Sequence, residues 1–390
     1  MTHALTGGRI LLESGMVQGH ALLIDNGQIA AIVGARDVPV GTPCTDLGEA
    51  TLLPGFIDCQ VNGGGGVLFN ENPTVEAIAA IGAAHRNYGT TGFLPTLLTD
   101  SFDVVRAGMA AVGEAIAQGV PGVLGIHIEG PFLSADRGGI HDPDKMRPLD
   151  EDGFALVTGM KRGVTLLTLA PERTSPAMIR RLTAAGIIVA AGHTNGTYAQ
   201  IRSGLDAGVR GFTHLFNAMS PLTSRAPGAV GAALEDDESW CGLIVDGHHV
   251  DPVTMRLALR LKRRERIMLV TDAMPSVGAA DKDFSLQGRP VTVRGGVCRD
   301  EFGTLAGSDL DMASAVRNAV RLLELPLEAA SMMASASPAE FLGIAPLHGR
   351  IAVGARADLV AMAENMTVQA SWIGGEGSGA VPAAPAVSST

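Results

Sequence analysis

Eight short apolar runs, separated by helix-like segments, occupy the sequence between residues 52 and 275. Each run has the length of a buried β-strand, and apolar residues recur at helical spacing in the intervening segments, as in SPAMIRRLTAAG and DPVTMRLALRLKR. Alternation of strand and helix predicts a parallel sheet covered by helices. Eight such units in about 220 residues are typical of a (β/α)8 TIM-type barrel. The runs are 52–60, 92–97, 123–131, 164–172, 187–194, 211–219, 241–249 and 267–275.

An open, doubly wound sheet is the alternative for such a pattern. That fold commonly carries GxGxxG directly after its first strand, and no such motif follows residues 52–60. The first fifty residues instead show short apolar runs broken by glycine, which predict antiparallel strands with turns at Asn26-Gly27 and around Gly34. A similar fragment, GRIAVGARADLVAM, lies near the other end of the chain. We therefore expect a small β-sandwich domain (1–53 and 346–376), a catalytic barrel (54–345) and a disordered tail rich in Gly, Ala, Pro and Ser (377–390).

Composition argues against several classes of function. The formal net charge is −11 and no basic stripe is present, which disfavours nucleic acid and membrane surfaces as partners. Four cysteines lack CxxC spacing, so neither a disulfide framework nor a thiolate zinc site is expected. The chain shows neither the pattern of a signal peptide nor an apolar stretch of membrane-spanning length. These features predict a cytoplasmic protein.

Polar residues gather where the predicted strands end. A lone histidine in an apolar run is more often a hydrogen-bonded core residue than a ligand, but here six strands repeat the pattern. In a (β/α)8 barrel the carboxyl ends of all strands meet at one mouth, which is where such barrels carry their active sites. The residues are Asp58, Gln60, Asn62, His127, Glu129, His193, His214, Asn217, Asp246, His248, His249 and Asp272.

One carboxylate and two imidazoles in this set suit a divalent metal ion. Glu129, His193 and His214 could hold Zn²⁺ with a fourth position open for water, and the same donors suit Fe²⁺ or Mn²⁺. A metal lowers the pKa of bound water enough to make a nucleophile near neutral pH. Asp272, in VTDAMP, is placed to accept that water's proton, although a helix N-cap would also explain an aspartate there.

Eight fragments, in order, carry a resemblance that covers nearly the whole chain. They are LPGFIDCQVNGGGG, GIHIEGPFLS, LAPE, AGHTNGTY, GFTHLFNAMSP, IVDGHHVDP, LVTDAM and GTLAGSDL. With them the sequence resembles the amidohydrolase superfamily and, within it, the family of N-acetylglucosamine-6-phosphate deacetylases. The resemblance implies that Glu129, His193 and His214 bind the metal and that Asp272 is the catalytic acid and base. It also implies hydrolysis of the N-acetyl group, giving acetate and glucosamine 6-phosphate, in amino-sugar catabolism or cell-wall recycling.

The same resemblance assigns the substrate contacts. His141, in RGGIHDPDK, would contact the substrate and polarise its carbonyl group, with a solvent-exposed loop residue as the alternative. In this family the arginine and the histidine that match Arg225 and His249 reach into the neighbouring subunit's site, so a homodimer is implied. His248 receives no role, and His127 is either hydrogen-bonded beside the metal or packed inside the barrel. The residues matched to substrate binding are Gly130, Asn217, Ala218, Arg225 and His249.

Gln60 and Asn62 stand where binuclear amidohydrolases have two histidines. Neutral carboxamides are weak ligands for Zn²⁺, so we predict one ion per subunit, with Gln60 and Asn62 positioning water or substrate. The alternatives are hydrolysis of a cyclic amide or an N-acyl amino acid, or a scaffold without activity. Hydrolases of cyclic amides commonly need a carboxylated lysine on the fourth strand, and VTLLTLAPE has none.

Overall fold

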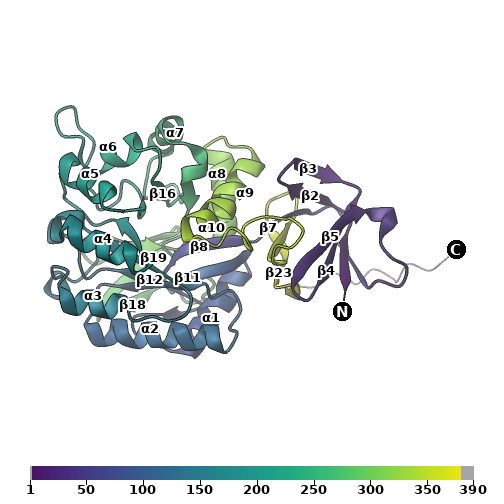
Figure 1. The fold of residues 1–390 in the computed structure, drawn as a ribbon, viewed down its shortest axis with the longest axis horizontal. Helices are drawn as coiled ribbons and strands as arrows, with labels where there is room; N and C mark the ends of the chain where they lie inside the picture. The colour runs from purple at the N-terminus through teal and green to yellow at the C-terminus, as the bar shows by residue number, and fades with distance from the viewer. Residues whose placement is uncertain (1, 379–390) are drawn as a thin grey trace.

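The computed structural model describes residues 2–378, in which a large barrel lies beside a smaller β domain (Figure 1). Eight parallel strands form the barrel sheet, and their spatial order follows the sequence. Its two edge strands meet where the Asn62 N–H donates to the Ala273 carbonyl oxygen at 2.9 Å, so the sheet is nearly closed. The predicted TIM-type barrel is thereby confirmed. Its strands are β8 (Phe56–Val61), β11 (Thr90–Leu98), β12 (Gly125–Glu129), β13 (Val164–Leu169), β14 (Ile188–Ala191), β15 (Gly211–Phe212), β16 (Trp240–Leu243) and β17 (Ile267–Leu269).

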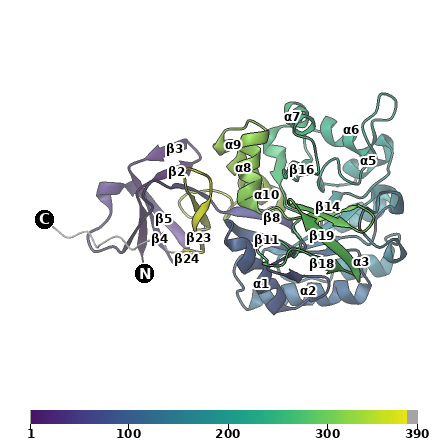
Figure 2. The same ribbon diagram turned by 180° about the vertical axis from the view of Figure 1, so that it is seen from behind.

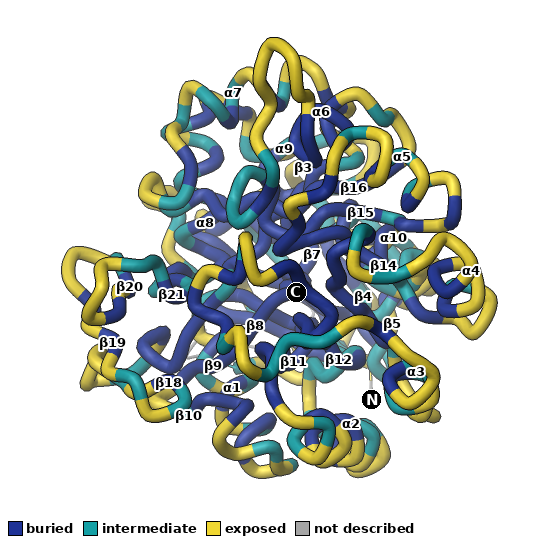
Figure 3. The backbone as a smooth tube through the Cα atoms, turned by 90° about the vertical axis from the view of Figure 1, so that its left-hand side faces the viewer, coloured by how far each residue is buried: buried dark blue, intermediate teal, exposed yellow. Residues whose placement is uncertain are grey.

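Helices surround the barrel strands (Figure 3). Local sequence decides where many of them begin, because a Ser, Thr or Asp side chain accepts a hydrogen bond from the first turn, as Thr197 does in α5 and Asp251 in α7. No helix in the part of the chain that the structure describes is long and apolar enough to cross a membrane. The helices are α1 (Val75–Arg86), α2 (Phe102–Ala117), α3 (Glu151–Val157), α4 (Pro176–Ala184), α5 (Tyr198–Asp206), α6 (Gly228–Glu235), α7 (Pro252–Leu261), α8 (Met312–Leu322), α9 (Leu327–Ala334) and α10 (Ala336–Leu342).

The small domain is a sandwich of two sheets that draw on both ends of the chain. Leu5 and Ile24 of one sheet pack with Leu52 and Trp372 of the other in a shared core. One sheet contains β5 (Gln28–Gly34), β4 (His20–Asp25), β1 (His3–Thr6) and β6 (Cys44–Asp46) in that order. The other contains β24 (Glu376–Ser378), β23 (Val368–Ile373), β22 (Leu359–Met362), β7 (Thr51–Pro54), β2 (Arg9–Leu12) and β3 (Gly15–Gln18).

The first predicted strand, 52–60, is divided in two by Gly55. Residues before it form β7 of the sandwich, and residues after it form β8 of the barrel. A Cβ at Gly55 would lie 2.1 Å from Thr91 Oγ1 of the barrel, so only glycine fits at this crossing. The prediction of one continuous strand was therefore wrong. The predicted disordered tail also begins too early, because Gly377 and Ser378 belong to β24; its remainder, 379–390, lies outside the described residues.

A third antiparallel sheet follows the last barrel strand and was not predicted (Figure 2, where β18 and β19 are labelled). Its signals are present in the sequence, because Gln287-Gly288 and Gly295-Gly296 separate short alternating runs and adopt the positive φ angles of tight hairpin turns. Its core includes Met274, which belongs to the barrel mouth. The strands are β18 (Phe284–Leu286), β19 (Arg289–Arg294), β20 (Val297–Asp300) and β21 (Leu305–Ser308), and a two-stranded sheet of β9 (Gly63–Gly64) and β10 (Val67–Leu68) follows β8.

Candidate active site

A pocket of about 370 Å³ opens at the carboxyl ends of the barrel strands. Residues that follow six different strands line it, as expected for the mouth of this fold. The structure thus brings most of the predicted site residues together in one place. Those lining the pocket are Asn62, Glu129, His141, His193, His214, Asn217, Ala218, His249 and Asp272.

Three buried side chains converge in this pocket as a candidate metal site. Glu129 Oε1 lies 3.0 Å from His214 Nε2 and 3.3 Å from His193 Nε2, and the two imidazole nitrogens lie 3.1 Å apart. Ligand atoms about 2.0–2.2 Å from one tetrahedral ion stand about 3.3 Å or slightly more from one another, so this spacing fits a single ion such as Zn²⁺. The buried trio is the one group of at least three His, Cys, Asp or Glu found close enough for a metal within residues 2–378.

Backbone contacts prepare His193 for metal binding. The Arg137 carbonyl oxygen lies 2.9 Å from His193 Nδ1, so that nitrogen carries the proton and Nε2 keeps its lone pair for the ion. Burial acts to raise the pKa of Glu129, but the adjacent imidazoles of His193 and His214 hold it well below its usual range. His193 and His214 both have positive φ angles, 44° and 32°, which non-glycine residues adopt at a cost and commonly at functional sites. These three residues therefore fit the predicted metal site.

Asp272 lies beside the metal site and is oriented by two carboxamides. Its Oδ1 accepts hydrogen bonds from Gln60 Nε2 at 3.0 Å and from Asn62 Nδ2 at 2.7 Å. The second oxygen, Oδ2, accepts no hydrogen bond within the described chain and is left for a proton from water or substrate. Burial, followed by the negative charge of Glu129, raises the pKa of Asp272 to about 6. A carboxylate with a pKa near the working pH suits proton transfer in both directions.

His141 is held as a neutral hydrogen-bond donor. The Thr99 N–H donates to His141 Nδ1 at 3.2 Å, so Nδ1 is the acceptor and the ring proton sits on Nε2. Burial, and then the neighbouring His193, lowers the pKa of His141 well below its usual value. Nε2 lies 3.8 Å from Glu129 Oε2, which places its N–H at the edge of the metal site. The side chain is buried, contrary to the alternative of a solvent-exposed loop residue.

Gln60 occupies the space between the two carboxylates. Its Nε2 donates to both Glu129 oxygens at 3.1 Å as well as to Asp272, and the side chain does not line the pocket. Gln60 therefore orients Glu129 and Asp272. Asn62 reaches the pocket, and its Oδ1 is a buried acceptor with no partner in the described residues. That oxygen is available to a donor from water or substrate.

The predicted substrate contacts fall into two groups. Asn217, Ala218 and His249 line the pocket, whereas Gly130 and Arg225 do not. His249 Nδ1 pairs with Asp246 Oδ2 at 2.6 Å beside its own subunit's pocket and its side chain is 6% exposed, so its reach into the neighbouring subunit's site stays a prediction.

Gly130 and Arg225 differ in their surroundings. Gly130 follows β12 and has a φ of 94°, and a Cβ there would lie 2.2 Å from Thr99 Oγ1, so glycine is required for packing. Arg225 lies on an exposed loop before α6. Its guanidinium therefore does not contact a substrate bound in its own pocket, and a phosphate contact from Arg225 would need the pocket of another subunit.

The two histidines without an assigned role, His127 and His248, lie in different environments. His127 is packed inside the barrel, with Nε2 2.8 Å from Thr168 Oγ1 and Nδ1 3.3 Å from Thr96 Oγ1. Burial lowers its pKa to about 4, so it is neutral. His248 is exposed, and its backbone N–H donates to Asp246.

Sequence reasoning missed part of the pocket wall. Arg137 lines the pocket and adds a cation from the same subunit, while its Nε donates to Asn195 Oδ1 at 3.1 Å. The only signal for it was its position four residues before His141. An apolar side of the pocket was also missed, and its residues come from the end of β11, from loops and from the unpredicted third sheet. This side consists of Leu98, Ile140, Met274 and Leu305.

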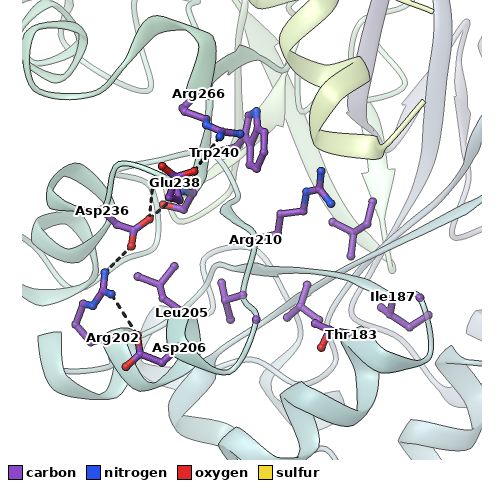
Figure 4. A pocket seen from close by; sticks show the side chains of 16 residues that line it. Thr183, Ile187, Arg202, Leu205, Asp206, Arg210, Asp236, Glu238, Trp240 and Arg266 are labelled. Atoms are coloured by element: carbon purple, nitrogen blue, oxygen red, sulfur yellow. Dashed lines mark hydrogen bonds and ion pairs between the residues drawn. The ribbon is translucent and has the colours of Figure 1, made fainter. Parts of the chain in front are cut away.

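A second hollow, of about 540 Å³, lies at the opposite ends of the strands (Figure 4). Its charged residues largely pair with one another: Arg202 contacts Asp206 and Asp236, and Arg266 contacts Glu238. The guanidinium of Arg266 also stacks 3.8 Å from the centre of the Trp240 ring. In barrels of this type, residues at the amino ends of the strands serve stability rather than catalysis. We therefore interpret the paired charges of this hollow as stabilising contacts.

Comparisons with known proteins agree with this geometry. The model of the amidohydrolase family matches residues 51–379. The N-acetylgalactosamine-6-phosphate deacetylase of Shewanella sp. (strain ANA-3) is 43% identical over 372 residues, which cover 95% of this chain and 94% of that protein. The crystal structure of N-acetylglucosamine-6-phosphate deacetylase from Pasteurella multocida superposes with a TM-score of 0.94 at 34% identity, covering 97% of this chain and all of that one.

A further solved structure is a mutant of the Mycobacterium smegmatis N-acetyl-D-glucosamine-6-phosphate deacetylase in complex with N-acetyl-D-glucosamine 6-phosphate. It has a TM-score of 0.88 and 34% identity, and the match covers 96% of this chain and 99% of that one. Likeness of this extent in sequence and in structure, over nearly the full length, shows the family. This chain belongs to the amidohydrolase family and, within it, to the deacetylases of N-acetylated amino-sugar 6-phosphates.

Proposed function

We propose that this protein hydrolyses N-acetylglucosamine 6-phosphate to glucosamine 6-phosphate and acetate. The observation that carries the proposal is one pocket holding a metal-binding trio, a carboxylate with a free oxygen and a neutral imidazole donor. The complex of the Mycobacterium smegmatis relative with that sugar phosphate supports the choice of substrate.

Each residue has a separate task in the reaction. Glu129, His193 and His214 would hold a divalent ion, which would supply a water of lowered pKa as the nucleophile. Asp272 Oδ2 takes the proton of that water as it attacks the acetyl carbon. His141 Nε2–H donates to the carbonyl oxygen, where negative charge develops. Asp272 then returns the proton to the sugar nitrogen as the C–N bond breaks, so acetate and the free amine leave.

We propose Zn²⁺ as the ion, at one per subunit. The Gln60 amide, an N–H donor, points at both carboxylates that a second ion would need, and an amide nitrogen does not bind metals.

The double variant Gln60→His/Asn62→His is expected to bind a second ion, because it supplies two imidazoles beside Glu129 and Asp272. Metal content per folded subunit, measured by elemental analysis, checks this. Gln60→Leu/Asn62→Leu is the control and should still hold one ion; two ions in the wild type would contradict the proposal.

The 4-epimer of the sugar is a second candidate substrate. The Shewanella relative, named for the galactosamine compound, is 43% identical, whereas the glucosamine deacetylases of Pasteurella multocida and Mycobacterium smegmatis described above are each 34% identical. Both sugars carry the same acetamide and 6-phosphate groups, so the chemistry described above serves either. The choice between them rests on contacts to the 4-hydroxyl.

The test is acetate release by purified protein of measured metal content. N-acetylglucosamine 6-phosphate, its galactosamine epimer, unphosphorylated N-acetylglucosamine and a cyclic amide would be compared. We expect rapid release from at least one sugar phosphate, slow release from the free sugar and no hydrolysis of the cyclic amide. Preferential hydrolysis of the cyclic amide, or no activity on either sugar phosphate, would overturn the proposal.

A homodimer completes the proposed phosphate site, with Arg225 supplied by the partner subunit. Helix α7 supports an interface beside this loop, because Val253, Leu257 and Leu261 form one apolar stripe at a spacing of four residues and are 55%, 52% and 61% exposed. Leu222, on the same exposed loop as Arg225, is 53% exposed. A second copy of the chain would bury these side chains together.

We propose that the enzyme works in the cytoplasm. Cys44, Cys59, Cys241 and Cys298 are all free thiols, which agrees with a reducing compartment. A sugar phosphate is charged and does not cross a membrane unaided, so an enzyme that uses it is expected in the compartment where that phosphate forms.

A further inference from the structure

Asp58 is a fully buried carboxylate with no part in the reaction described above. It lies on β8, two residues before Gln60, and its oxygens accept three hydrogen bonds. Oδ1 accepts from the backbone N–H of Gln60 at 3.1 Å and from that of Thr271 at 3.3 Å, and Oδ2 accepts from the Thr271 hydroxyl at 2.5 Å. One carboxylate therefore joins the first and the last strand of the barrel, immediately beside Gln60 and Asp272.

The segment that this carboxylate holds is strained. Asp272 has a φ of 53°, which costs free energy for a non-glycine residue and persists only where surrounding contacts enforce it. Thr271 enforces it from the preceding position, because its hydroxyl oxygen also accepts the Ala273 N–H at 3.2 Å. Ser308 of β21 acts from the other side, donating its N–H to the Asp272 carbonyl at 2.9 Å and its hydroxyl to the Thr271 carbonyl at 2.6 Å.

We propose that Asp58 is a positioning residue that acts through Thr271 to aim the Asp272 carboxylate. The proposal rests on the function proposed above for Asp272. Asp58 fixes the Thr271 hydroxyl, and that hydroxyl fixes the turn that carries Asp272. The same carboxylate sets the backbone of Gln60, whose amide orients Asp272 Oδ1. Both partners of that hydrogen bond are therefore anchored to one buried group, and Oδ2 keeps its direction toward the substrate.

The test compares Thr271→Val, which removes the hydroxyl and keeps the shape, with Thr271→Ser, which keeps the hydroxyl. We expect Thr271→Val to lower kcat by about 10–100-fold, because small displacements of a catalytic group cost this much, with KM and metal content unchanged. Thr271→Ser should retain most of the wild-type kcat. Thr91→Val is the matched control, because Thr91 is equally buried in β11 but its hydroxyl contacts only the Phe56 carbonyl, at 3.4 Å, away from the pocket.

Asp58→Asn, alone and combined with Thr271→Val, tests whether the carboxylate acts through the threonine. If it does, the double variant loses no more kcat than Thr271→Val alone. Should Thr271→Val fail to fold, Asp58→Asn measured in the same way decides the question. Wild-type kcat in Thr271→Val or Asp58→Asn, or an equal loss in Thr271→Ser or Thr91→Val, would overturn the inference. Failure of the proposed function looks different, because then wild-type protein releases no acetate from either sugar phosphate.

Discussion

Asp272→Asn is expected to bind metal as the wild type does and to lose about 10²–10⁴-fold in kcat, the usual contribution of a general acid and base. Asparagine can still accept hydrogen bonds from Gln60 and Asn62 through its Oδ1, so the site should keep its shape. It cannot take the proton of the attacking water or return one to the leaving nitrogen. Single-turnover and steady-state acetate release, together with elemental analysis, measure the two effects separately.

Asp309→Asn is the matched control for this substitution. Asp309 pairs with Lys282 at 3.0 Å and does not line the pocket, so its loss should leave kcat unchanged. An Asp272→Asn protein that turns over at the wild-type rate would remove Asp272 from the proton-transfer role. Loss of metal from the same variant would instead make Asp272 a ligand, and the single-ion site would need a fourth protein donor.

Arg225→Ala is expected to lower kcat/KM for the phosphorylated substrate by about 10–100-fold, since a hydrogen bond between charged partners is worth about 1.5–3 kcal/mol. Activity on the unphosphorylated sugar should not change. Arg137→Ala provides the comparison, because Arg137 is the arginine that lines the pocket from its own subunit. If Arg137→Ala alone shows the phosphate-specific loss, the phosphate contact belongs to Arg137 and not to Arg225.

Mixed dimers test whether Arg225 acts across the subunit boundary. Co-expressed Arg225→Ala and Asp272→Asn subunits give a hybrid in which one site has both an intact Asp272 and an intact Arg225 from the other chain. Activity should therefore reappear in the hybrid, although each parent is weak. Leu257→Asp, on the exposed stripe of α7, should yield monomers with the same phosphate-specific loss. A fully active monomer, or hybrids no better than their parents, would contradict a shared site.

Periodic features of the sequence predicted most of the fold. Buried strands and amphipathic helices are local patterns, and the segments around α4 and α7 stood out for this reason. The predicted turn at Asn26-Gly27 is confirmed, because both residues have positive φ angles, 49° and 79°, in the hairpin between β4 and β5. The third sheet was not predicted because the glycine-punctuated segment 284–308 lies after the alternation of strand and helix that marks the barrel.

Most residues of the site could be predicted from the sequence, but the geometry that brings them together could not. Chain position placed Glu129, His193 and His214 at strand ends, yet β15 has only two residues because the chain turns sharply at His214. Such positive φ angles are enforced by tertiary contacts and leave no local pattern. The ring proton of His141 likewise depends on the Thr99 N–H, which lies far away in sequence. Motif spacing also says nothing about which subunit's pocket a side chain faces, so the predicted reach of Arg225 and His249 across a dimer stays a prediction.

The pairing of β7 with β22 has a consequence for how the chain is made. On the ribosome, residues 51–54 emerge about three hundred residues before the strand that completes their sheet, so the barrel can form first. During that interval the edge of β7 and the apolar side of Leu52 lack their final cover. Because β8 follows directly after Gly55, the nascent barrel already carries Gln60 in place. The last strands to be translated thus complete the sandwich after the barrel and its active site have formed. Truncation before residue 359 should therefore yield aggregation rather than a smaller soluble enzyme.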